Sequence, residues 1–160
     1  MSLETSRPDR ESRGDFHVPP VWVEQDSLFF ITINCANRGI TQLTKDTIAR
    51  ELFESISFYK NSNRWWPEIV LLMPDHLHAL IRFSWSPNHG MNQVISAWKR
   101  YTARKNSINW QRDFFDHRIR GEQDHNDKWH YIQQNPVRKG LVEDFADWPH
   151  VWRPHQIGWR

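Results

Sequence analysis

The order of apolar patterns along the chain predicts an α+β domain on the ferredoxin-like plan. Segments rich in β-branched and aromatic residues alternate with amphipathic helical patterns in the order strand, helix, strand, strand, helix, strand. This is the βαββαβ order of ferredoxin-like domains. One more helical pattern follows the last strand, so we also expect an appended C-terminal helix.

The first strand and the first helix have the clearest patterns. Residues 28–34 (Leu-Phe-Phe-Ile-Thr-Ile-Asn) are β-branched and aromatic, and the turn sequence Asn37-Arg38-Gly39 follows them. Apolar residues then recur at helical spacing, which predicts a helix over about 44–60. These residues are Ile48, Leu52, Phe53, Ile56 and Tyr59.

A hairpin is expected next, with strands over about 68–73 and 76–83 and the turn pair Pro74-Asp75 between them. From Leu77 to Phe83 every second residue is apolar, whereas His76, His78 and Arg82 occupy alternate positions. Since successive side chains of a strand point to opposite faces, one face is expected to lie under helices and the other to carry polar groups.

The second half of the chain repeats the alternation. Helical spacing predicts a helix over about 90–105, with Met91, Val94, Ile95, Trp98 and Tyr101 on its apolar side. Its other side carries Lys99, Arg100, Arg104 and Lys105, which are expected either to contact phosphates or to form a solvated face. A strand over 114–119 and a helix over 122–134 follow, and Pro136 is expected to stop that helix.

The length of 160 residues is that of a single domain. Residues 1–20 are polar, carry both signs of charge and end in Pro19-Pro20, which predicts a disordered leader before a domain over 21–145. Residues 146–160 are expected to form a tail rich in tryptophan. Its rings either stack on bases or fold back over the domain; they are Trp148, Trp152 and Trp159.

Composition narrows the class of protein. The single cysteine, Cys35, excludes an internal disulfide and favours a cytoplasmic location. Neither a signal-peptide core nor an apolar run of the ~20 residues that span a bilayer is found, so no membrane partner is expected. The net charge of +2 permits a nucleic-acid partner without demanding one. Ten Trp and nine Phe offer faces for unpaired bases, although most are expected to fill the core.

Two pairs of residues point to chemistry. His76 and His78 are expected on one face of the sheet, where they form half of a metal site or a pair of solvent-facing histidines. Tyr131 and Asn135 share one face of the appended helix. If this helix covers the histidines, a bound cation and the phenol together suit attack on a phosphodiester.

Other interpretations of these residues remain open. Asn135 precedes a proline and is a candidate helix-terminating residue. His117 and His130 are candidates to complete a zinc site, although no matching spacing supports one. Tyr59 and Tyr101 are in phase with core positions, which makes them poorer candidates for a nucleophile than Tyr131.

The motifs carry a family resemblance. Residues 73–78 (Met-Pro-Asp-His-Leu-His) resemble the His-hydrophobe-His signature of HUH nucleases and single-tyrosine transposases. Residues 131–142 (Tyr-Ile-Gln-Gln-Asn-Pro-Val-Arg-Lys-Gly-Leu-Val) resemble the segment typical of one branch, the REP-associated tyrosine transposases. Trp110, residues 114–117 and residues 119–120 match the same branch in order, so the similarity spans about 26–153.

The resemblance implies a metal-dependent DNA strand transferase that cleaves and rejoins single-stranded REP-type hairpin DNA. It makes His76 and His78 the ligands of Mg²⁺ or Mn²⁺ and Tyr131 the nucleophile that becomes 5′-phosphotyrosine. Asn135 occupies the position where related insertion-sequence transposases carry Gln as a third ligand. This branch is expected to act as a monomer.

Contacts to DNA are predicted at four basic residues, Arg100, Arg104, Lys105 and Arg138. Two alternative functions remain: a sequence-specific DNA-binding module with vestigial catalysis, and a metal-dependent phosphodiesterase that uses water. The complete His76, His78 and Tyr131 set argues against the first alternative, and only experiment separates the second.

Overall fold

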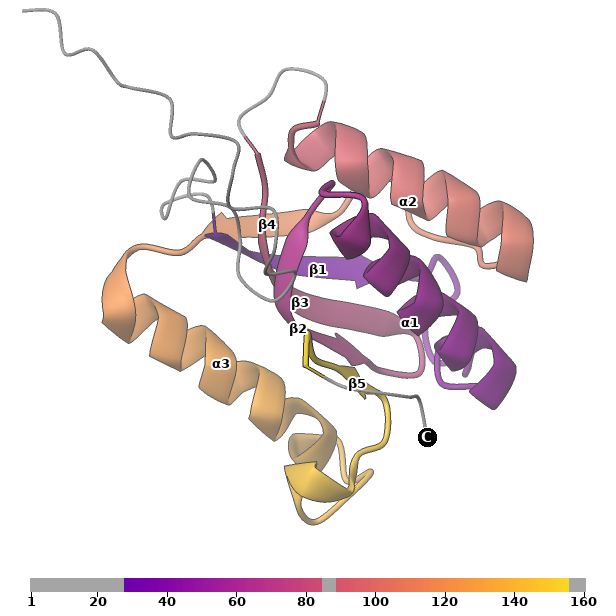
Figure 1. The fold of residues 1–160 in the computed structure, drawn as a ribbon. Coiled ribbons are helices and arrows are strands. Elements are labelled where there is room, and N and C mark those ends of the chain that lie inside the picture. Colours follow the sequence, from indigo (N-terminus) through magenta and orange to yellow (C-terminus); the bar gives the residue numbers. More distant parts are fainter. Residues whose placement is uncertain (1–27, 85–88, 156–160) are drawn as a thin grey trace, which may run out of the picture.

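A five-stranded antiparallel sheet forms the centre of the molecule in the computed structural model, which describes residues 28–84 and 89–155 (Figure 1). The strand order across the sheet is β4-β1-β3-β2-β5. The strands are β1 (Leu28–Asn34), β2 (Trp66–Leu72), β3 (His76–Arg82), β4 (Phe115–Arg118) and β5 (Val151–Trp152). The first four strands and the two helices between them follow the βαββαβ order, so the ferredoxin-like prediction is confirmed.

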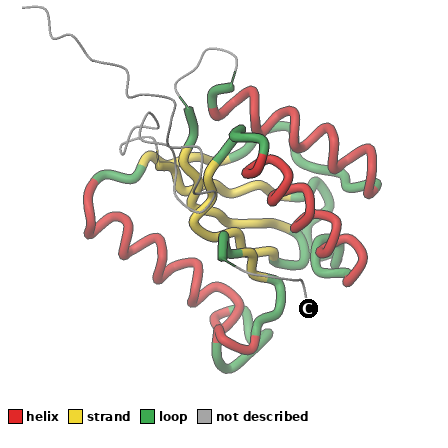
Figure 2. The backbone as a smooth tube through the Cα atoms, in the orientation of Figure 1, coloured by secondary structure: helices red, strands yellow, loops and turns green. Residues whose placement is uncertain are grey.

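Helices cover both faces of this sheet (Figures 1 and 2). On one face lie α1 (Asp46–Asn61) and α2 (Met91–Asn106), and on the opposite face lies α3 (Gly121–Arg138). A large apolar core, which includes Leu52 and Trp98, fills the space under α1 and α2. A smaller core under α3 contains Phe30, Leu80 and Ile132. None of the described helices is long and apolar enough to cross a membrane.

The alternation along β3 divides its side chains between these two cores. Leu77, Ala79 and Ile81 belong to the large core under α1 and α2. Leu80 belongs to the small core under α3, and His76 and His78 occupy alternate positions on the same side of the strand. The polar face expected from the sequence is therefore the face that α3 covers.

The helix α3 is longer than the sequence predicts, because it continues through Pro136 to Arg138. The predicted stop near Pro136 is wrong: a proline removes one helical N–H donor, but the buried ring still packs within the last turn. The helix ends instead at a Schellman motif on Gly140, whose φ is +73°. There the Leu141 N–H donates to the Pro136 carbonyl at 3.0 Å and the Gly140 N–H donates to the Val137 carbonyl at 2.9 Å.

The segment after α3 returns to the sheet. A short 3₁₀ helix (Phe145–Asp147) leads to β5, which pairs with β2. The Trp148 indole donates to the Leu72 carbonyl at 3.0 Å, and the Trp152 indole donates to the Ser57 hydroxyl at 2.9 Å. Of the two alternatives for the tryptophans, these two rings therefore fold back over the domain. Trp159 and the predicted leader over 1–20 lie outside the described residues.

Candidate functional site

The two histidines lie side by side at the start of β3. The tight turn before them is closed by the Met73 N–H, which donates to the His76 carbonyl at 2.8 Å. Their ring centroids are 4.8 Å apart, and both side chains are buried, with His78 only 5% exposed. The predicted common face is confirmed, and α3 shields it from bulk water.

Hydrogen bonds fix the orientation of both rings. The His76 Nδ1 lies 2.7 Å from the Asp75 carboxylate, and the His78 Nδ1 lies 2.8 Å from the Thr32 hydroxyl. A carboxylate only accepts, so the His76 proton is on Nδ1 and the lone pair is on Nε2. In both rings Nε2 is the nitrogen that is available to a ligand. Metal-binding histidines are typically held in this way by an outer carboxylate or hydroxyl.

Burial keeps the imidazoles uncharged. It lowers the pKa of His76, although Asp75 opposes the shift, and it lowers the pKa of His78 to about 3. Neutral imidazole is the form that binds metal ions. Burial alone would raise the pKa of Asp75, but the hydrogen bonds from Gly39 and His76, together with the nearby charge of Arg38, hold that pKa below its usual range.

A loop after β1 supports Asp75 from outside. The Gly39 N–H donates to the Asp75 carboxylate at 2.8 Å, and glycine suits this position because its φ is +84°. The Arg38 guanidinium lies 3.4 Å from the same carboxylate and donates to the Asn34 side-chain oxygen at 2.6 Å. A positive group therefore stands at the outer edge of the histidine pair.

The helix α3 brings Tyr131 to the histidines. The Tyr131 ring centroid lies 5.3 Å from that of His78 and 5.8 Å from that of Phe30, both edge to face. Ile132, which is fully buried, anchors this part of the helix to the sheet. Tyr131 itself is 39% exposed, so its hydroxyl-bearing side chain lies at the boundary between the site and solvent.

Asn135 lies one helical turn beyond Tyr131 and is only 6% exposed. It is inside the helix, so its interpretation as a helix-terminating residue is wrong. The positive charge of Lys139, one turn further, contributes to the lowered pKa of both His76 and His78. Within the described part of the chain, the Asn135 side-chain oxygen is buried without a hydrogen-bond partner.

This donor set fits a divalent cation. A buried amide oxygen that lacks a partner loses its hydration without replacement, and a bound metal ion would supply the missing interaction. Two imidazole nitrogens and an amide oxygen are donors that divalent metals accept. The zinc alternative has no support: His117 is paired with Asp124 at 2.9 Å, His130 is exposed, and no three His, Cys, Asp or Glu among the described residues form a metal-binding group.

The unpaired side-chain oxygen of Asn135 predicts a gain in stability when the amide is removed. Asn135→Leu, which replaces the amide by an apolar group of similar size, is expected to raise the free energy of unfolding of the metal-free protein by about 1 kcal/mol. Urea denaturation with a chelator present measures the change. Gln133→Leu, at a half-buried position two residues earlier, is the control and should change stability by less than about 0.5 kcal/mol. A loss of stability in Asn135→Leu would mean that the amide has a structural role.

The predicted DNA contacts divide between the two faces of the sheet. The Arg138 guanidinium lies 5.8 Å from the centre of the Tyr131 ring, so this residue belongs to the site. Arg100, Arg104 and Lys105 are exposed on α2, across the sheet from α3 (Figure 1). Lys99 donates to the carbonyls of Gln111 and Arg112 at 2.7 and 2.9 Å, which is a structural role.

The other tyrosines are far from the histidine pair. Tyr59 is buried in the large core, as expected. The expectation that Tyr101 is also a core residue is wrong, because its side chain is 46% exposed and the neighbouring Thr102 takes the buried position. Both residues belong to helices on the opposite face of the sheet (Figure 1). Tyr131 is the tyrosine that contacts His78.

Three supporting residues were not identified from the sequence. The sequence places Asp75 in a turn, although its position directly before His76 is also a usable signal. Thr32 and Arg38 approach the histidines only through the pairing of β1 with β3 and the fold of the following loop. No local pattern marks either residue.

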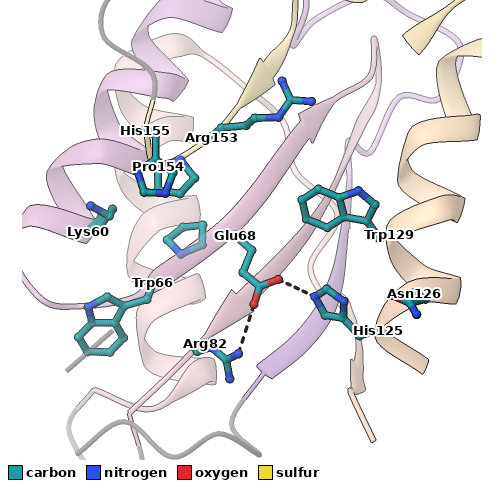
Figure 3. Close-up of a pocket in the computed structure, with 11 residues that line it drawn as sticks. Lys60, Trp66, Glu68, Arg82, His125, Asn126, Trp129, Arg153, Pro154 and His155 are labelled. Carbon is teal, nitrogen blue, oxygen red and sulfur yellow. Dashed lines mark hydrogen bonds and ion pairs between the residues drawn. The ribbon is translucent and has the colours of Figure 1, made fainter. Parts of the chain in front are cut away.

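A pocket of about 650 Å³ lies at the other end of β3, beside the first half of α3 (Figure 3). At its centre Glu68 accepts hydrogen bonds from His125 at 2.7 Å and Arg82 at 3.3 Å, and the His125 ring stacks on Trp129. Arg82 is four residues beyond His78 on the same strand, a separation of ~13 Å. The pocket is therefore distinct from the histidine site.

Fold and site together define a class. A ferredoxin-like sheet that carries a His-x-His pair beneath a tyrosine-bearing helix is the arrangement of a single-tyrosine HUH protein. Over 126 residues the chain is 30% identical to a REP-associated tyrosine transposase of Escherichia coli, a match that covers 76% of this chain and 73% of that protein. The chain belongs to the REP-associated tyrosine transposase family, and the resemblance seen in the sequence is confirmed.

A second relative agrees with this assignment, and a solved structure agrees with the fold. A relative from Haemophilus influenzae is 28% identical over 141 residues, which cover 77% of each protein. The solved structure of a REP-associated tyrosine transposase bound to a REP hairpin superposes with a TM-score of 0.68 at 24% identity. The superposition covers 87% of this chain and 90% of the chain in that structure, which supports the same fold. No family model matches the chain.

Proposed function

We propose that this protein is a metal-dependent transposase that cleaves and rejoins single-stranded REP-type hairpin DNA through a 5′-phosphotyrosine intermediate. The observation that carries the proposal is the contact between Tyr131 and His78 within one chain, with ring centroids 5.3 Å apart. The hairpin substrate is inferred from the solved family member that is bound to a REP hairpin. Because Tyr131 contacts His78 of its own chain, we propose that the protein acts as a monomer.

His76 and His78, through their Nε2 atoms, and Asn135, through its side-chain oxygen, are the proposed ligands of Mg²⁺ or Mn²⁺. When bound, the ion would polarise the scissile phosphate and offset its negative charge. The protein's part is to hold neutral, oriented donors in a site with little water. The unpaired oxygen of Asn135 and the engaged Nδ1 atoms of both histidines support this assignment.

The proposed chemical step is a transesterification at one phosphorus. The Tyr131 oxygen bonds to phosphorus while the bond from phosphorus to the 3′ oxygen breaks, which leaves a 5′-phosphotyrosine and a free 3′-OH. The phenolic proton passes to solvent, which the partly exposed Tyr131 reaches, and the departing oxygen takes up a proton. Attack by a 3′-OH on the phosphotyrosine reverses the step, so rejoining needs no ATP.

Positive groups surround the place where the phosphate would lie. Arg38 stands beside Asp75, Arg138 lies over the Tyr131 ring, and Lys139 acts on both histidines. We propose that these groups hold the DNA backbone at the site. Arg100, Arg104 and Lys105 are proposed as more distant phosphate contacts, whose neutralisation weakens binding and flattens its dependence on salt.

The test of the proposal is covalent capture. The protein is incubated with a labelled REP-type hairpin that has a single-stranded flank, with Mn²⁺ or with a chelator, and run on a denaturing gel. A protein–DNA adduct that requires the metal is the expected result. Metal-dependent cleavage with no adduct would instead indicate a phosphodiesterase that uses water, and hairpin binding without cleavage would indicate a binding module.

The orientation of His76 by Asp75 predicts a measurable change in metal affinity. Asp75→Asn replaces a charged acceptor by a neutral one at 2.7 Å from Nδ1, and is expected to weaken Mn²⁺ binding by about 10-fold. Isothermal titration calorimetry measures the affinity. Asp116→Asn, at an exposed position of β4, is the matched control and should bind Mn²⁺ as the wild type does. Equal affinity in both variants would exclude this role of Asp75.

A further inference from the structure

Phe115 is a large apolar side chain that the fold leaves in water beside the site. It lies at the start of β4, and 57% of its surface is exposed. Its ring meets the buried Phe30 edge to face, with centroids 6.5 Å apart. This contact places the Phe115 ring on the face of the sheet that α3 covers, the same face as the histidines.

The strand register puts Phe115 in line with His78. Thr32 on β1 pairs with His78 on one side and with Phe115 on the other, so the three residues form one row across the sheet. Neighbouring strands are ~4.8 Å apart, which gives ~10 Å between the backbones of Phe115 and His78. A base attached to a sugar next to a phosphate held at the histidines can reach across this distance.

The ring belongs to a chain of aromatic contacts that ends at the tyrosine. Phe30 lies between the two residues, since its centroid is 6.5 Å from that of Phe115 and 5.8 Å from that of Tyr131. Positive groups lie beside these aromatic rings. The Lys128 ammonium lies 5.9 Å from the Phe30 ring, and the Arg138 guanidinium lies 5.8 Å from the Tyr131 ring. An exposed ring among positive groups is the arrangement with which proteins bind single-stranded nucleic acid.

A second exposed phenylalanine, Phe58, provides a matched control away from the site. Phe58 is 60% exposed, but it lies on α1, on the opposite face of the sheet. The Arg64 guanidinium lies 5.9 Å from the centre of its ring. Phe58 therefore matches Phe115 in residue type and exposure but not in its relation to the histidines and Tyr131.

We propose that Phe115 stacks on the unpaired base next to the scissile phosphate and thereby positions that phosphate for Tyr131. This inference rests on the proposed function and adds a contact to the substrate base. Stacking on an aromatic face tolerates any base, so Phe115 is expected to fix the position of the nucleotide more than its identity.

The test compares Phe115→Ala with Phe58→Ala in binding to a hairpin that carries a single-stranded flank, with fluorescence anisotropy as the readout. Phe115→Ala is expected to bind about 10-fold more weakly than the wild type, and Phe58→Ala to bind as the wild type does. Phe115→Trp should restore binding because it restores a stacking face. Phe115→Leu keeps an apolar contact with Phe30 but has no ring, and should share the defect of Phe115→Ala. Unchanged melting temperatures show that the variants are folded.

An abasic substrate separates stacking from any other effect of the substitution. Single abasic positions are placed in turn along the flank around the cleavage point. At one abasic position the affinity of the wild type for the DNA is expected to fall by the same factor of about 10. At that position the affinity of Phe115→Ala is expected to fall no further. The inference would be overturned if every abasic position weakened binding by the wild type and by Phe115→Ala equally. It would also be overturned if Phe115→Ala bound the intact DNA as tightly as the wild type does. Adduct formation by the wild-type protein is scored separately, so this inference and the proposed function can fail independently.

Discussion

Tyr131→Phe is expected to abolish the covalent adduct and to slow DNA cleavage by at least about 1,000-fold. The substitution removes only the hydroxyl, so the edge-to-face contacts of the ring with His78 and Phe30 remain. The fold and the binding of hairpin DNA should therefore be unchanged. A denaturing gel measures adduct and cleaved strand, and anisotropy of the labelled hairpin measures binding.

The matched control for this substitution is Tyr101→Phe. Tyr101 is also partly exposed on a helix, but α2 lies across the sheet from the histidines. The control should form the adduct at the wild-type rate. Cleavage that persists in Tyr131→Phe would show that the attacking group is water or another side chain.

His76→Ala is expected to weaken Mn²⁺ binding by at least about 100-fold and to reduce cleavage to a comparable extent. The variant loses one of the proposed nitrogen donors, while the Arg38 and Gly39 contacts of Asp75 remain to hold the turn. Hairpin binding should be largely retained, because the positive groups around the site are unchanged. Calorimetry with Mn²⁺ and the covalent assay measure the two effects.

His89→Ala is the control for the loss of an imidazole, since His89 is exposed in the chain before α2. It should bind Mn²⁺ and cleave DNA as the wild type does. If His76→Ala bound Mn²⁺ with wild-type affinity, the proposed ligand set would be wrong, even if cleavage were lost.

Most of the fold was predictable because its signals are local. The apolar alternation in residues 76–83 separates two faces of one strand, and the helical spacing from Ile48 to Tyr59 defines one buried side of α1. The two halves of the site were predictable for the same reason. His76 and His78 share a strand face and Tyr131 and Asn135 share a helix face, whatever the rest of the chain does.

Features that depend on distant contacts were not predictable. The two-residue strand β5 is too short to show an alternating apolar pattern. It forms because it pairs with the edge of β2. The helix α3 continues through Pro136 because the ring is buried and a Schellman motif ends the helix two residues later. The exposure of Tyr101 follows from how α2 is rotated against the sheet, which leaves Thr102 inside.

The sequence by itself determined the βαββαβ order, the family motifs and the identities of the proposed ligands and nucleophile. These are properties of short segments, and side-chain periodicity fixes which residues share a face. Only the tertiary structure decided that α3 lies over the histidine face, that Thr32 and Asp75 orient the two rings, and that the Asn135 oxygen is buried without a partner. Those facts depend on strand register and helix packing, which join residues far apart in the chain and which no local pattern encodes.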